Sequence, residues 1–130
     1  MQLTRNFNLS EFQSKDGSKM PQEVLFNIQK VANQLQVLRD YLCFPIHVLS
    51  GYRSIEHNKA VGGVKNSYHT FGMACDIQVK EMNSIEVYKA IEFLIEEGSI
   101  LQGGVGVYPT FVHYDFRGSK ARWQKDITVK

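Results

Sequence analysis

The sequence predicts an α+β fold in which helices pack on one side of a small, mostly antiparallel sheet. Two segments, residues 21–38 and 83–97, carry apolar residues at the steps of three and four that line one face of a helix. Four shorter apolar runs predict strands. The chain has 130 residues, of which 43% are hydrophobic, so we expect a single domain covering residues 1–130 with a core of its own.

The first part of the chain is predicted to be helical. Residues 8–14 suit a short helix, because Ser10 and Gln13 have the spacing of a capping box. A longer helix begins at Pro21, since proline suits a first helical turn in which its missing N–H would have no partner. We expect its buried face to consist of Val24, Ile28, Val31, Leu35 and Leu38.

The remaining elements follow a strand, loop, strand and helix order. Residues 46–50 predict a strand, and a loop rich in glycine and asparagine follows it with one helical turn after Ser54. Residues 73–79 predict a second strand, and residues 83–97 a helix that stops at Gly98. "GGVGVY" and "FVHYDF" predict two strands joined by a turn at Pro109 and Thr110. The buried face of the second helix is expected to contain Tyr88, Ile91, Leu94 and Ile95.

Composition excludes some classes of partner. The formal net charge is only +2 and the basic residues are spread from Arg5 to Lys130, which does not favour nucleic-acid binding. No apolar run approaches the roughly 20 residues that span a bilayer. The N-terminus lacks a secretory pattern, so we expect synthesis in the cytoplasm without a signal peptide of its own. We also expect a monomer.

Two histidines and an aspartate form a candidate metal site. "SYHTFGMACD" contains His69 and Asp76, and "FVHYDF" contains His113 and Asp115 on one face of a strand. If the two predicted strands pair, His69, Asp76 and His113 meet, and three such ligands suit a zinc ion with an open position for water. The spacing alone leaves a second interpretation open, in which Asp76 caps a turn and the histidines are solvated. His47 and His57 are interpreted as structural residues.

Three separated motifs add a resemblance to a known family. They are "SGYRS", the pattern Ser-x-His-x-x-Gly-x-Ala-x-Asp in "SYHTFGMACD", and "GGVGVYPTFVHYDFRG". In order and spacing they resemble the zinc D-alanyl-D-alanine carboxypeptidase family, whose superfamily includes vancomycin-resistance D,D-dipeptidases, L-alanyl-D-glutamate lysins and the Hedgehog signalling domain. The resemblance covers about residues 7–123. It implies one zinc ion held by His69, Asp76 and His113, with Arg53 acting in the site and Ser67 binding substrate.

One position departs from the family pattern. Many members carry an acidic general base three residues before the last histidine ligand, where this chain has Thr110. Asp115, which shares the strand face of His113, is the best substitute. It acts either as the catalytic base or as a partner that orients the His113 ring, and the sequence leaves both roles open.

The resemblance implies a zinc metallopeptidase that acts on the peptidoglycan stem peptide. D-Ala-D-Ala carboxypeptidase activity is the first expectation. The alternatives are an L-alanyl-D-glutamate or other wall endopeptidase, and a non-catalytic zinc-containing module that binds the wall or belongs to a virion. If the protein is a phage lysin, it acts at the cell wall or in the periplasm.

Overall fold

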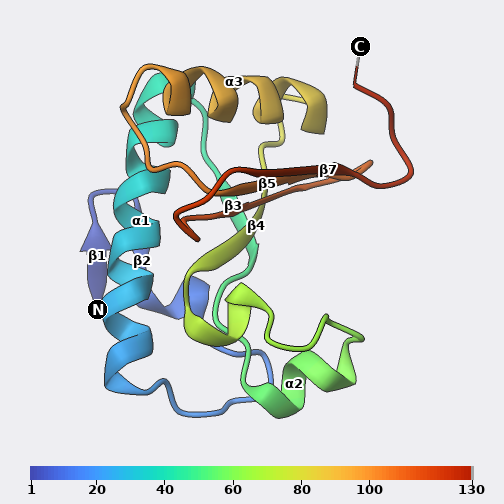
Figure 1. The fold of residues 1–130 in the computed structure, drawn as a ribbon. Coiled ribbons are helices and arrows are strands. Elements are labelled where there is room, and N and C mark those ends of the chain that lie inside the picture. Colours follow the sequence, from blue (N-terminus) through green and yellow to red (C-terminus); the bar gives the residue numbers. More distant parts are fainter. Residues whose placement is uncertain (130) are drawn as a thin grey trace.

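A computed structural model describes residues 1–129 and arranges them as helices around a five-stranded sheet, with a two-stranded hairpin at the N-terminus (Figure 1). The helical elements are η1 (Leu9–Phe12), α1 (Gln22–Leu42), α2 (Ile55–Ala60), η2 (Tyr68–Phe71) and α3 (Ser84–Glu96). The strands are β1 (Gln2–Thr4), β2 (Phe7–Asn8), β3 (His47–Ser50), β4 (Ala74–Gln78), β5 (Gly104–Val107), β6 (Val112–Asp115) and β7 (Ala121–Gln124).

The large sheet has the order β3-β4-β6-β5-β7. All neighbouring strands in it are antiparallel except β5 and β7, which are parallel. The predicted α+β class and the mostly antiparallel sheet are therefore confirmed. The sequence interpretation missed β7 and the β1–β2 hairpin, which are short and carry no long apolar run.

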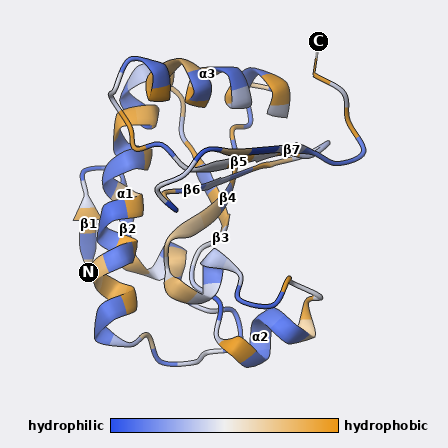
Figure 2. Cartoon of the chain, in the orientation of Figure 1, coloured by the Kyte–Doolittle hydropathy of each residue, from blue (hydrophilic) through white to orange (hydrophobic). Residues whose placement is uncertain are grey.

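The two faces of this sheet have different surroundings. Side chains alternate along a strand, so Cys75 and Ile77 of β4 and Val112 and Tyr114 of β6 point to one face and enter the hydrophobic core. Helices α1 and α3 cover that face, and Figure 2 shows apolar and polar residues alternating around both helices. The opposite face, which carries Asp76 and His113, is left for a polar site. Within residues 1–129 no helix is both long and apolar enough to cross a membrane.

The two long helices begin and end close to where the sequence predicts. Pro21 lies one residue before α1, and all five residues expected on its inner face are buried. Asn83 caps α3, and the chain turns out of the helix at Gly98 with φ of 74°. On α3, Ile91, Leu94 and Ile95 are buried as expected, and Tyr88 is only half-buried.

The predicted capping box near the N-terminus is wrong by two residues. The box is formed by Asn8 and Glu11, not by Ser10 and Gln13, and it opens the single 3₁₀ turn η1. Asparagine is as good a cap as serine, and the strand β2 already occupies Phe7 and Asn8. The buried anchor of this segment is Phe12, which is 0% exposed.

Candidate metal centre

The pairing of β4 with β6 places Asp76 directly opposite His113. In this antiparallel register the two side chains share a face, and Nδ1 of His113 lies 3.1 Å from Oδ1 of Asp76. The strand pairing considered from the sequence is thus present. Because both residues lie on central strands of the sheet, their positions are fixed by the backbone ladder and not by a loop.

His69 reaches the same point from the short helix η2. Its Nε2 lies 3.2 Å from Oδ1 of Asp76. The chain can return from η2 into β4 because Gly72 adopts φ of 73°, and a Cβ there would come within 2.8 Å of Val24. The hydroxyl of Ser67 accepts a hydrogen bond from the backbone N–H of His69 at 3.2 Å and so caps η2.

The outer nitrogens of both imidazoles are held by acceptors. Nδ1 of His69 lies 2.8 Å from the carbonyl oxygen of Gly51, and Nε2 of His113 lies 2.7 Å from Oδ2 of Asp115. A carbonyl or carboxylate can only accept, so these ring nitrogens carry the protons when the imidazoles are neutral. The inner nitrogens, Nε2 of His69 and Nδ1 of His113, then present lone pairs to Asp76.

Three acceptor atoms therefore converge on one point. The ligand atoms of His69, Asp76 and His113 all lie within 4.8 Å of one another, and the residues are 3%, 8% and 8% exposed. Lone pairs that face one another away from water need a cation between them, either protons on the imidazoles or a metal ion. Two imidazoles and a carboxylate are the ligand set of an open zinc site, so the residues fit the metal that the sequence predicts.

The electrostatics of the three side chains agree with this arrangement. Burial raises the pKa of Asp76, but hydrogen bonds from His113 and His69 outweigh it, so the net pKa lies well below its usual range. Burial lowers the pKa of His113, yet the carboxylates of Asp115 and Asp76 outweigh that effect and raise it. A metal ion bound here would have to compete with a proton on His113.

Arg53 lies beside the cluster, as the "SGYRS" motif suggests. It follows β3, and its side chain is 17% exposed. Nη2 donates to Oδ2 of Asp76 at 3.2 Å, Nη1 to Oδ1 of Asn58 at 3.2 Å and Nε to the hydroxyl of Ser50 at 3.2 Å. The guanidinium thus contacts the carboxylate oxygen that does not face the histidines.

Asp115 lies behind His113 rather than in front of the cluster. It is 0% exposed and contacts Nε2, the ring nitrogen that points away from Asp76. Its two oxygens also accept hydrogen bonds from the guanidinium of Arg117 at 2.9 and 2.8 Å and from the backbone N–H of Gly104 at 2.9 Å. Burial raises the pKa of Asp115, but these hydrogen bonds more than compensate and keep the carboxylate ionised.

The cluster opens into a cleft of about 530 Å³. Its lining includes residues 62–69, among them Lys65 and Ser67, and the aromatic residues Tyr108, Phe111 and Trp123 of the sheet end. Tyr108 and Phe111 stack with ring centroids 4.3 Å apart, and Trp123 packs on His113 at 5.1 Å. Aromatic side chains beside a few convergent polar groups are typical of a ligand-binding cleft.

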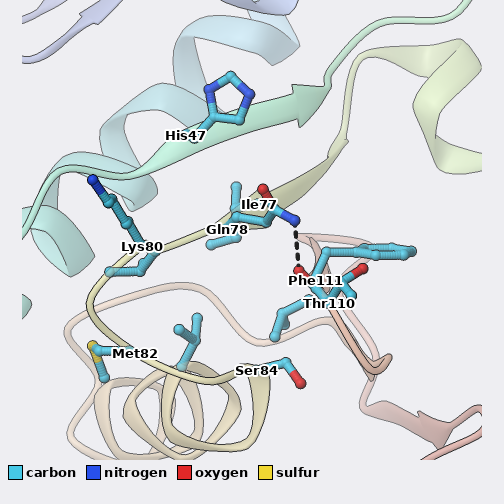
Figure 3. A pocket seen from close by; sticks show the side chains of 11 residues that line it. His47, Ile77, Gln78, Lys80, Met82, Ser84, Thr110 and Phe111 are labelled. Carbon is cyan, nitrogen blue, oxygen red and sulfur yellow. Dashed lines mark hydrogen bonds between the residues drawn. The ribbon is translucent and has the colours of Figure 1, made fainter.

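Thr110, at the position where the family pattern has its base, lines a different cleft. That cleft, of about 440 Å³, lies between β4, β6 and the start of α3, and Figure 3 shows Thr110 there together with Gln78 and Ser84. The carbonyl oxygen of Thr110 accepts a hydrogen bond from Nε2 of Gln78 at 2.8 Å. His47 also lines this second cleft.

The structure adds residues that the sequence interpretation missed. Arg117 lines the metal cleft and stacks its guanidinium 4.3 Å from the ring centroid of Tyr68. Trp123 comes from β7, one of the strands that the sequence did not predict. Asn58, which contacts Arg53, follows it by five residues. The arginine in "HYDFRG" is two residues after Asp115, a spacing that places both on one strand face and could have indicated the pair.

Comparison with known proteins gives the same family as the motifs. A family model described as Peptidase M15 matches residues 2–115. The peptidoglycan L,D-endopeptidase MepK of Escherichia coli K12 is 37% identical over 86 residues, which are 61% of this chain and 43% of that protein. The probable peptidoglycan L,D-endopeptidase MepK of Haemophilus influenzae is 39% identical over 77 residues, or 54% and 38% of the two chains.

This chain therefore spans less than half the length of these curated relatives. The family match covers most of its residues, including "SGYRS", all three candidate ligands and Asp115. The chain belongs to the Peptidase M15 family.

Proposed function

We propose that this chain is a zinc-dependent peptidoglycan peptidase. The observation that carries the proposal is the convergence of three buried acceptor atoms, Nε2 of His69, an oxygen of Asp76 and Nδ1 of His113, in a peptide-sized cleft of a Peptidase M15 chain. These residues would hold one zinc ion. A zinc ion bound there would activate water at neutral pH and polarise the carbonyl group of the scissile bond.

The chain's own residues have separable tasks in this proposal. Arg53 has one guanidinium edge against Asp76 and lines the cleft, so it is placed to bind a substrate carboxylate or the developing oxyanion. Ser67 lines the cleft with its hydroxyl oxygen engaged by the N–H of His69, which leaves the hydroxyl proton to donate to substrate. Both roles follow from the family resemblance and from their place in the cleft.

For Asp115 the geometry supports the orienting role over the base role. Its carboxylate is buried behind His113 and already accepts from Arg117 and Gly104. A base must reach the proton that it removes, within about 3.2 Å or through one water. Asp115 instead fixes the tautomer and the plane of the His113 ring, which favours metal binding through Nδ1.

We further propose that the enzyme is an endopeptidase. The family resemblance implied D-Ala-D-Ala carboxypeptidase as the first expectation and endopeptidase as an alternative. The curated relatives are named L,D-endopeptidases, and their similarity to this chain moves the preference to the alternative. A cleft of about 530 Å³ lined by residues 62–69 and by aromatic residues of the sheet end also has room for peptide on both sides of a cleaved bond.

The test is a digest of defined substrates with the metal content measured in parallel. Protein purified without added metal is analysed for zinc, and purified peptidoglycan is incubated with it before and after chelation. The expected result is one zinc per chain and new amine ends, with products that mass spectrometry assigns to an internal bond. Release of D-alanine alone would restore the carboxypeptidase assignment. Binding to the wall without cleavage would indicate the non-catalytic module.

A further inference from the structure

Asn58 is a buried polar residue that joins two walls of the candidate site without contacting the three candidate ligands. It lies on α2 and is 5% exposed. Its Oδ1 accepts from Nη1 of Arg53 at 3.2 Å, and its Nδ2 donates to the carbonyl oxygen of Val64 at 2.9 Å. Its backbone carbonyl accepts from the N–H of Gly63 at 2.8 Å. One side chain therefore connects the guanidinium of Arg53 to residues 63–64, a segment of the cleft rim.

Gly63 shows how closely the rim approaches this pair. A Cβ on Gly63 would lie 2.0 Å from Oδ1 of Asn58 and 3.1 Å from Nη1 of Arg53. The first distance is shorter than any non-bonded contact allows and the second is tight, so a side chain at position 63 would push the carboxamide of Asn58 aside and crowd the guanidinium of Arg53. The backbone of the rim is thus packed directly on the Asn58–Arg53 hydrogen bond.

The three contacts of Arg53 account for its orientation. A guanidinium carries five N–H donors in one plane. Ser50, Asn58 and Asp76 each take one of them, and they act on Nε, Nη1 and Nη2 respectively. Ser50 and Asp76 hold the edge formed by Nε and Nη2. Asn58 holds the far nitrogen, Nη1, and so completes the set of contacts that fixes the plane of the guanidinium beside the cleft.

We propose that Asn58 is a positioning residue. It fixes the position of the Arg53 guanidinium relative to the cleft rim at residues 63–64, so that both can bind substrate. This inference rests on the proposed peptidase function. It assigns to α2 the task of aligning Arg53. A misplacement of about 1 Å in a positioning group can cost roughly 100-fold in rate, so the effect on turnover is measurable although Asn58 lies outside the reacting atoms.

A double-mutant cycle on kcat/KM tests this role, with Asn58→Ala and Arg53→Lys made singly and together. Asn58→Ala alone is expected to lower kcat/KM by about tenfold or more, with zinc affinity unchanged within about twofold. If Asn58 acts through Arg53, adding Asn58→Ala to Arg53→Lys costs less than about threefold further. Lys59→Ala, an exposed change on the same helix, serves as the control with unchanged kcat/KM.

A substitution at Gly63 tests the same Asn58–Arg53 pair independently. Gly63→Ala inserts a methyl group against Asn58. The loss of kcat/KM that it causes should also be non-additive with the loss caused by Arg53→Lys. Gly62→Ala is the matched comparison, because its φ of 73° strains the same rim while nothing lies within 4 Å of the added Cβ. The loss of transition-state stabilisation in Gly62→Ala, calculated from kcat/KM, should simply add to the loss in Arg53→Lys.

The outcomes separate this inference from the proposed function. If the wild type is active and the losses of kcat/KM in Asn58→Ala and Arg53→Lys multiply in full in the double variant, the positioning role is wrong and the peptidase assignment stands. An Asn58→Ala variant that loses zinc in step with activity would lead to the same conclusion, because its effect would then be on the metal centre. A wild-type protein with stoichiometric zinc and no cleavage of peptidoglycan would overturn the proposed function itself.

Discussion

Asp76 in the candidate metal centre and Asp16 in the loop before α1 are both carboxylates whose pKa lies below its usual value. Asp16 accepts from the hydroxyls of Ser14 at 2.7 Å and Ser54 at 2.6 Å, and from the N–H of Ser18 at 3.0 Å. All of its partners are donors. Asp76 faces two imidazole nitrogens that carry no proton while the rings are neutral, and only Arg53 supplies a donor that is always charged.

The comparison shows that a lowered pKa does not by itself mark a metal site. The lone pairs of Asp16 are satisfied by hydroxyl and amide protons. The Asp16 carboxylate therefore has a structural role, since it binds the loop to Ser54, the N-cap of α2. The lone pairs around Asp76 meet other lone pairs, and that arrangement requires a cation. The direction in which the neighbouring protons point distinguishes the two carboxylates.

The largest expected effect comes from removing one of the converging lone pairs. His113→Ala should lose zinc altogether in protein purified without added metal, because two ligands remain and the Asp115 carboxylate loses its imidazole partner. Elemental analysis measures the loss. His47→Ala is the matched control, since His47 is exposed and lines the other cleft. Stoichiometric zinc in His113→Ala would show that the ligand assignment is wrong.

Arg53→Lys should have the next largest effect, on turnover and not on metal content. The substitution keeps the charge but removes the planar fork that contacts Asp76, Asn58 and Ser50, and the loss of a charge-stabilising donor typically costs roughly 100- to 1000-fold in kcat. Steady-state kinetics and zinc analysis are compared with those of Arg39→Lys on α1. An Arg53→Lys variant that is fully active, or one that unfolds, would contradict a role in binding substrate.

Asp115→Asn should weaken metal binding by about 10- to 100-fold, as expected for a partner that orients a ligand. The amide can still contact Nε2 of His113, but it no longer carries the charge that holds the imidazole proton there. Zinc competition titrations measure the affinity, and excess zinc should restore most of the rate. If the variant binds zinc normally and stays inactive at saturating metal, Asp115 is the base after all.

The sequence predicted the meeting of Asp76 with His113 well because regular structure sets the positions of both residues. Antiparallel pairing fixes Asp76 opposite His113, and strand periodicity alone places His113 and Asp115 on one face. The face of α1 follows equally well from steps of three and four.

What the sequence could not show are contacts between segments without a period. The Asn58–Arg53–Val64 connection depends on how a six-residue helix and an irregular loop fold back on each other. The parallel strand β7 depends on its partner β5, and the position of Thr110 in the second cleft does not follow from local spacing. Tertiary packing decided each of these cases.

The smallest effect is expected at Asp16, the carboxylate whose partners are all donors. Asp16→Asn should lower Tm by a few degrees at neutral pH, because the neutral amide accepts more weakly from Ser14 and Ser54, and the zinc content should stay at the wild-type level. A variant with reduced zinc would erase the distinction between the two carboxylates.

The pH dependence of this small effect follows from the direction of the pKa shift. Hydrogen bonds from Ser54, Ser14 and Ser18 hold the pKa of Asp16 in the folded protein below its ordinary value of 3.8. The unfolded chain therefore binds the proton first as the pH falls. The stabilisation from Asp16 is present in full above that value and is lost as the pH drops toward the folded pKa. The difference in Tm between wild type and Asp16→Asn should be constant from about pH 7 to pH 5 and should narrow below about pH 4. A difference that instead grows on acidification would mean that Asp16 is stabilised in its protonated form, and the hydroxyl donors assigned to it would then be wrong.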